Sequence, residues 1–145
     1  MAWWKIWDKN GGSGGRAPDY YEEGVALSRR DLHHDALTSF RLALKQRPDD
    51  SACLEQMAVA YTHIGQFDEA VRCYSSALEL SPQSPSAHYG LAFLLLKAGA
   101  QREATGHLQA FLQHSRSDRE ETRHLAHARR TLQRLGVPAG DPTAS

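Results

Sequence analysis

Histidine is the residue type of this chain whose spacing could do chemistry. His107 and His114 lie two turns apart on one predicted helix, and His124 and His127 lie three residues apart on the next. Imidazole nitrogens are common zinc ligands, so such pairs could contribute to a metal site. No carboxylate or thiolate is clearly placed to complete a ligand set. We therefore expect these histidines to face solvent, and we expect no metal or other cofactor.

Four arginines form a row on the last predicted helix, within about 60° of each other at 100° per residue. They are Arg119, Arg123, Arg130 and Arg134. Such a row could hold an acidic partner or phosphates, although a solvated outer helix face explains it equally simply. The chain has 17 basic and 17 acidic residues, with a pI near 7.1. This balance argues against nucleic acid as a partner and limits any membrane contact to a peripheral one.

Motifs for catalysis are missing from the sequence. It contains no nucleophile elbow, no Walker loop and no metal-type spacing of its two cysteines, Cys53 and Cys73. The GGSGG stretch at residues 11–15 lacks the features of a phosphate loop and is typical of a flexible linker. No secretory signal and no membrane-spanning apolar run is present. We expect a non-enzymatic, cytoplasmic protein with reduced thiols.

Residues 17–116 repeat themselves with a period of 34 residues. Small residues recur at two positions of each unit, and a large apolar residue follows each of them. The recurring sets are Gly24, Ala58 and Ala92; Leu27, Tyr61 and Leu95; Ala36, Ala70 and Ala104; and Phe40, Tyr74 and Leu108. Apolar residues return at intervals of three and four, which predicts two helices in each unit. The small residues let the two helices of a hairpin approach closely.

The second unit, SACLEQMAVAYTHIGQFDEAVRCYSSALELSP, is a near-consensus match to the tetratricopeptide repeat family. This resemblance implies an all-α, right-handed superhelical solenoid of three helix-turn-helix repeats, at about 17–50, 51–84 and 85–116. One departure is Asp31, which stands where Gly65 and Gly99 mark the turn within the later units. We expect the first turn to be built differently.

The third unit has Phe111 and Arg116 where the earlier units have alanine and proline, so a different element should follow it. Residues 118–135 predict a seventh, capping helix, which would complete a domain over residues 17–136 and leave 137–145 as a disordered tail. An apolar side of this helix would cover the last repeat, and Gly136 would end it. That side consists of Leu125, Ala128, Leu132 and Leu135.

In this family the first helix of each hairpin lines a concave surface that binds partner peptides. Carried over by position, the lining here is mostly apolar and aromatic. It comprises Tyr21, Val25, Arg29, Glu55, Val59, Thr62, His63, Tyr89, Phe93, Leu96 and Lys97. Tyr89 and Phe93, four residues apart, could face this groove or the core. The cationic clamp that some family members use for heat-shock chaperone tails is absent, because its places hold Tyr21, Val25, Gln56, Ser86 and Gly90.

These residues predict a protein-interaction adaptor or scaffold that binds an apolar or amphipathic peptide or helix in its groove. A first alternative is a cytosolic chaperone that shields a hydrophobic client, since three repeats with an apolar groove also resemble the class II chaperones of bacterial type III secretion. A second alternative is an accessory factor that handles a metal or phosphate through the histidines and arginines.

The N-terminal segment, residues 1–16, carries all three tryptophans of the chain ahead of the linker. Trp3, Trp4, Ile6 and Trp7 form a docking segment, because burying their side chains would be strongly favourable. The segment could dock in its own groove or in a neighbour's, which would make it an autoinhibitor or an arm for self-association. It could instead bind a partner protein or a membrane interface, cover the first helix, or have no role.

Overall fold

The computed structural model describes residues 18–115 and 119–137, with side chains from residue 122 onward in the second range. Within these ranges the chain forms seven helices and no strand, as predicted. They are α2 (Tyr20–Arg29), α3 (His33–Gln46), α4 (Ser51–His63), α5 (Phe67–Leu80), α6 (Pro85–Lys97), α7 (Gln101–His114) and α8 (Arg119–Arg134). Among them, none combines the length and apolar character that crossing a bilayer requires.

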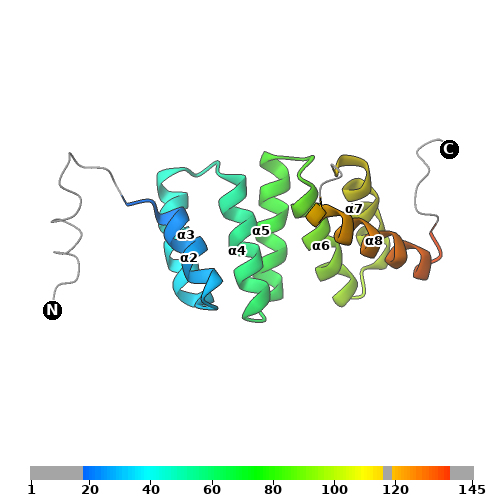
Figure 1. Cartoon of the computed structure of the whole chain (residues 1–145), viewed down its shortest axis with the longest axis horizontal. Coiled ribbons are helices and arrows are strands. Elements are labelled where there is room, and N and C mark those ends of the chain that lie inside the picture. The colour runs from blue at the N-terminus through cyan, green and yellow to red at the C-terminus, as the bar shows by residue number, and fades with distance from the viewer. Residues whose placement is uncertain (1–17, 116–118, 138–145) are drawn as a thin grey trace.

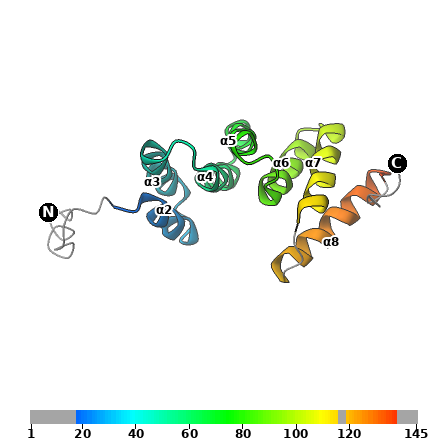
Figure 2. The same ribbon diagram turned by 90° about the horizontal axis from the view of Figure 1, so that it is seen from above.

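Consecutive helices pair into three hairpins, α2–α3, α4–α5 and α6–α7, which follow one another along the long axis of the molecule (Figure 1). Seen from above, α2, α4 and α6 form one layer and α3, α5 and α7 form the other (Figure 2). Neighbouring helices of the first layer also contact one another. The result is a helical solenoid with α8 packed against its last hairpin.

A capping side chain fixes the start of each first-layer helix. Asp19 accepts a hydrogen bond from the Glu22 amide at 3.1 Å, and Asp50 accepts one from the Cys53 amide at 3.1 Å. Ser84 accepts a longer one from the Ala87 amide. Each bond satisfies an amide that the helix itself leaves without an acceptor. The helices that line the proposed groove therefore begin at defined residues.

The turn inside the first hairpin is built like the later two, so the expectation of a different turn at Asp31 is wrong. Asp31 has a φ of 59°, close to the 81° of Gly65 and the 82° of Gly99. The amide of Leu32 donates to the Leu27 carbonyl, five residues back, as the equivalent amides of the later turns do. Aspartate reaches this left-handed conformation more readily than most residues, so it can replace glycine here.

Helices of the core approach closely where a glycine on one helix faces an aromatic ring on the next. A Cβ atom added to Gly24 of α2 would lie 2.5 Å from the ring of Phe40 of α3, which is fully buried. A Cβ atom added to Gly90 of α6 would overlap the ring of Tyr74 of α5. The first contact closes a hairpin, and the second joins one hairpin to the next.

The helix α8 covers the end of the solenoid through a second apolar cluster. Ala128 and Leu132 of α8 are fully buried against Leu108 and Phe111 of α7, together with Ala92 of α6. This explains why the third repeat has phenylalanine where the others have alanine, since the ring packs against the capping helix. The helix ends at Arg134 and is followed by Gly136 with a φ of 74°. Leu125 packs at the edge of the cluster, whereas Leu135 is only partly buried and lies outside it.

We predict opposite effects for two helical glycine-to-alanine substitutions. Gly24→Ala should lower the free energy of unfolding by about 1–3 kcal/mol, because the buried Phe40 ring has no room to move away. Gly106→Ala is the matched control, since nothing lies within 4 Å of the added atom, and it should raise that free energy by about 0.5–1 kcal/mol. Urea denaturation measures both. Equal effects of the two substitutions would contradict the packing role of Gly24.

Candidate functional site

A cavity of about 310 Å³, which we call the apolar pocket, lies between α4 and α6. Its lining comes from α4, α5 and α6 and is mostly apolar. The residues are Val59, Thr62, His63, Phe67, Tyr74, Tyr89, Gly90, Phe93, Leu94 and Lys97. Six of these are among the predicted groove residues: Val59, Thr62, His63, Tyr89, Phe93 and Lys97. Val59 leaves 38% of its surface exposed, and it is one of three large apolar residues exposed in the described chain.

The polar groups of the apolar pocket are mostly engaged within the protein. The Thr62 hydroxyl donates to the Ala58 carbonyl at 2.8 Å. Burial raises the pKa of Tyr74 to about 12, so its phenol is neutral. The Lys97 ammonium lies 4.2 Å from the centroid of the Phe67 ring, in a cation–π contact that keeps the charge at this side of the pocket. The arrangement offers apolar surface with one cation beside it, which suits an apolar or amphipathic side chain.

Tyr89 and Phe93 satisfy both alternatives that the sequence left open, because they line the apolar pocket and also pack against the capping helix. The two ring centroids lie 4.8 Å apart. The Phe93 ring stacks on His127 of α8, with centroids 4.6 Å apart, and the Tyr89 hydroxyl is hydrogen-bonded to His127 Nδ1 at 2.8 Å. The Tyr89 ring also packs against the ring of Phe111 of α7, with centroids 4.9 Å apart. The rings of Tyr89 and Phe93, which line the pocket, are therefore supported from behind by α8, which the repeat pattern alone does not indicate.

The other predicted groove residues lie outside the apolar pocket. Leu96 packs against the cluster that joins α6, α7 and α8. Val25 packs against the main core, and Arg29 is exposed on α2. Glu55 accepts hydrogen bonds from the hydroxyls of Ser84 and Ser86, so its carboxylate ties α4 to the start of α6. These side chains hold the repeats together or face solvent, and the pocket is smaller than the predicted groove.

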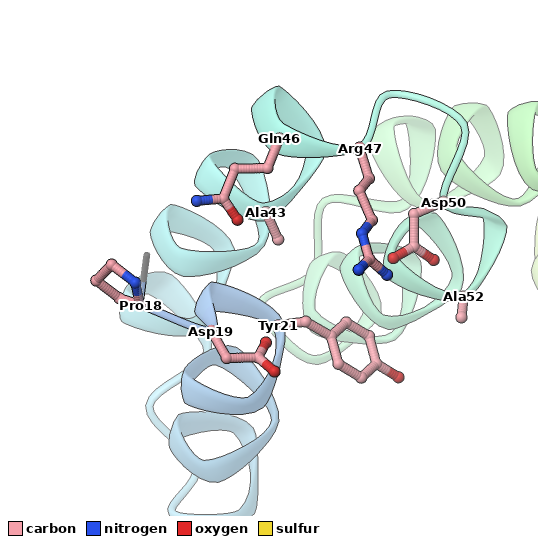
Figure 3. Close-up of a pocket in the computed structure, with 8 residues that line it drawn as sticks. All are labelled: Pro18, Asp19, Tyr21, Ala43, Gln46, Arg47, Asp50 and Ala52. Carbon is pink, nitrogen blue, oxygen red and sulfur yellow. The ribbon is translucent and has the colours of Figure 1, made fainter. Parts of the chain in front are cut away.

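Tyr21 lines a separate hollow of about 490 Å³ at the other end of the solenoid (Figure 3). The starts of α2 and α4 and the end of α3 form this hollow, and its lining is largely polar. Asp19 and Asp50 line it while capping their helices, and the Arg47 side chain extends into the same region (Figure 3). The predicted docking segment, Trp3, Trp4, Ile6 and Trp7, lies outside the described residues.

Two of the four arginines of the predicted row share a third depression, which we call the α8 depression, of about 580 Å³. It is lined by His127, Arg130, Gln133 and Arg134. Arg123 is exposed but does not line it, and the Arg119 side chain lies outside the described residues. The α8 depression and the apolar pocket meet at the stacked rings of Phe93 and His127.

Three of the four histidines named above, His107, His114 and His127, are partly buried rather than solvent-facing. His124 is exposed, but its ring also packs against that of Tyr89, with centroids 4.7 Å apart. His88 Nε2 lies 2.8 Å from the Pro82 carbonyl, which can only accept, so Nε2 donates there. In the tautomer whose proton is on Nε2, His88 Nδ1 accepts from His107 Nδ1, at 2.9 Å. His114 stacks nearby, with its centroid 6.4 Å from that of His88.

Metal binding and thiol chemistry find no support in the described part of the chain. No group of three or more histidine, cysteine, aspartate or glutamate side chains there is arranged to hold a metal ion. Burial raises the pKa of Cys53 to about 12 and that of Cys73 to about 11, so both thiols are protonated at neutral pH. The Cys53 thiol donates to the Phe40 carbonyl at 3.3 Å and has a structural role.

Residues 58–99 match the family model described as the TPR repeat. This part of the chain carries tetratricopeptide repeat sequence. The matched residues run from the middle of α4 to the end of α6, and so include most of the lining of the apolar pocket. The resemblance of the second unit to this family is thereby confirmed.

Solved TPR structures share the fold of this chain at low sequence identity. A complex of the Yersinia enterocolitica type III secretion chaperone SycD with a peptide of the translocator YopD has a TM-score of 0.75 at 19% identity, covering 81% of this chain and 89% of that one. The second TPR of Spaghetti (RPAP3), bound to an HSP90 peptide, has a TM-score of 0.65 at 16% identity, covering 66% of this chain and 89% of that one. MamA from Desulfovibrio magneticus has a TM-score of 0.62 at 19% identity, covering 65% of this chain and 53% of that one.

The SycD similarity extends beyond the three hairpins. These span residues 20–114, which are 95 of the 145 residues or about 66% of the chain, whereas the SycD match covers 81%. The identities are low, so the similarities establish a TPR-like solenoid and nothing about ligands.

We predict that the free energy of unfolding falls as the pH is lowered from about 7.5 to about 5.5. Burial, followed by the neighbouring His88, lowers the pKa of His107 below its ordinary 6.5. The unfolded chain then binds more protons than the folded one, so the contribution of His107 is complete above pH 6.5 and is lost as the pH falls.

Denaturation of a His107→Gln variant at several pH values tests this prediction. Its pH dependence should be shallower than that of the wild type, because glutamine can still donate to His88 but does not titrate. The control is His34→Gln, at an exposed position of α3, which should retain the full dependence. An unchanged pH slope in the His107 variant would contradict the assignment.

Proposed function

We propose that this TPR protein is a non-enzymatic, cytoplasmic adaptor that binds an apolar or amphipathic segment of a partner protein in the apolar pocket. The observation that carries the proposal is the exposed Val59 beside the rings of Phe67 and Phe93, on the layer formed by the first helices. Solvent-exposed apolar surface of this kind is unfavourable unless something covers it. A partner side chain that removes it from water gains about 1.5–3 kcal/mol.

The known neighbours support a peptide as the type of ligand. The SycD structure contains a peptide of a translocator, and the Spaghetti TPR contains an HSP90 peptide. Binding of a peptide through its terminal carboxylate fits the present chain less well. The positions that correspond to a carboxylate clamp hold Tyr21, Val25, Gln56, Ser86 and Gly90, none of which is a cation. An apolar anchor on the partner suits the pocket better than a terminal carboxylate.

The size of the apolar pocket limits what it can bind. At about 310 Å³ it lies at the lower end of the range for ligand pockets, about 300–1,000 Å³. We infer that one or two apolar side chains of the partner enter it, while the rest of the segment lies along α4 and α6. The affinity then comes from a small number of anchors, as in other grooves that bind peptides.

A second candidate function is a chaperone that shields a hydrophobic client. The observation that favours it is the extent of the SycD similarity, which reaches beyond the three hairpins. A chaperone of this class would keep a client soluble that precipitates without it. Co-expression of the chain with a captured partner, with solubility compared against expression of the partner alone, separates a chaperone from an adaptor whose partner is soluble by itself.

We predict that a photo-crosslinking amino acid at Val59 captures the partner, whereas the same amino acid at Leu80 does not. Leu80 is the matched control, because it is also exposed and apolar, at 47%, but lies at the end of α5 in the other layer. Mass spectrometry of the crosslink identifies the bound segment, which can then be synthesised. Equal capture from both positions would contradict the proposed site.

Affinity of that synthetic segment for charged variants provides the quantitative test. Val59→Glu should weaken binding by about tenfold or more, because a carboxylate in the pocket would lose its hydration on binding. Leu80→Glu should leave the affinity unchanged. Circular dichroism checks that both variants fold, which the exposure of the two positions leads us to expect. An unchanged affinity of Val59→Glu would rule out the apolar pocket as the binding site.

A further inference from the structure

We propose that the α8 depression is a subsite for acidic side chains, so that the bound segment carries carboxylates next to its apolar anchors. The inference rests on the proposed function and specifies the chemistry of the partner. It assigns a binding role to Arg130 and Arg134 of α8, acting together with Lys97 of α6.

The α8 depression adjoins the apolar pocket directly. The ring of His127 lines the former, the ring of Phe93 lines the latter, and the two rings stack with centroids 4.6 Å apart. A peptide whose side chain enters the apolar pocket therefore has the arginines of α8 on one side. Lys97 lines the apolar pocket itself, so cations flank the apolar surface along this boundary.

The positive charge of this region is not offset by carboxylates in the part of the chain that the structure describes. The ion pairs found there join Asp31 to His33 and Glu69 to Arg72, and neither involves Lys97, Arg130 or Arg134. Both arginines are exposed, and the Arg134 guanidinium donates a hydrogen bond to the Thr131 hydroxyl at 3.4 Å.

The pKa of His127 is affected by the same positive charges. Burial is the main cause that lowers its pKa, and Arg130, Arg134 and His124 lower it further. Among the side chains that the structure describes, the charges that act on this ring are those of basic residues of α8. From α6, the Tyr89 hydroxyl faces the ring within hydrogen-bonding distance, and burial raises the pKa of that phenol.

The geometry favours two acidic residues on one segment. Arg130 and Arg134 are four residues apart, which places them about 6 Å apart along the helix axis. Acidic residues two apart on an extended peptide, at about 6.6–6.8 Å, match this spacing, and so do residues three or four apart on a helix. Guanidinium groups bind carboxylates through pairs of charge-assisted hydrogen bonds. The balanced charge of the whole chain favours a polypeptide over an anionic membrane.

Three synthetic peptides that share one apolar core test the inference. One carries glutamates before the core, one carries them after it, and the third has glutamine at all of these positions. One acidic peptide should bind about five- to tenfold more tightly than the glutamine peptide at low salt, in line with two partly exposed charge pairs. At about 0.5 M salt this preference should shrink to twofold or less, because added salt shortens the range of exposed charges.

The double substitution Arg130→Gln/Arg134→Gln should abolish the preference and leave the affinity for the glutamine peptide unchanged. Arg102→Gln, at an exposed position of α7, is the matched control and should retain the preference. A second readout is the titration of His127 by NMR. Binding of the acidic peptide should raise the pKa of His127 in the wild type, because the added carboxylates offset the arginines, and should not raise it in the double variant.

The outcomes separate this inference from the proposed function. Binding of all three peptides with equal affinity, or a preference that survives the double substitution, would overturn the acidic subsite and leave the apolar pocket in place. Failure of every peptide to bind would overturn both. Binding to vesicles that contain phosphatidylserine, lost in the double variant and without any preference among the peptides, would assign the arginines to lipid and also overturn the inference.

Discussion

The close approach of helices at glycine and alanine is the constraint on which the rest of this structure depends. Gly24 has no side chain because the ring of Phe40 fills the space in front of it, and Gly90 stands in the same relation to Tyr74. The alanines of the repeats, such as Ala58 and Ala92, are fully buried at equivalent positions. These contacts set how far each helix lies from the next, and they keep the helices in two layers.

The proposed binding surface follows from that two-layer arrangement. A helix of the first layer packs against its hairpin partner and its two neighbours, and nothing in the repeat covers its remaining face. On α4 and α6 this remaining face carries apolar side chains, which form the apolar pocket. The capping helix then closes one end of this surface with His127 and brings arginines to its edge. Scaffold and site are therefore formed by the same helices.

The sequence was sufficient to predict the helices and hairpins, and less so the site. The period of 34 residues identifies the helix pairs, because small residues recur where helices must touch. It could not show that Glu55 would be bound by two serines of the next repeat, or that His88 would pair with His107. Periodicity indicates which face of a helix is apolar, but not which neighbouring element covers that face. For this reason the sequence could not show that Leu96 packs against the cluster that joins α6, α7 and α8, or that His127 contacts Tyr89 of α6.

The division of the apolar residues into two clusters has a consequence for how the molecule opens. One cluster runs from α2 to α6, the other joins α6 to α7 and α8, and only α6 contributes to both. Cooperativity between the two ends must pass through this single helix. Amide hydrogens of α7 and α8 can therefore exchange through a local opening that leaves the first two hairpins intact. Helix α8, which carries the arginines of the proposed subsite, can therefore shift without disturbing the first two hairpins.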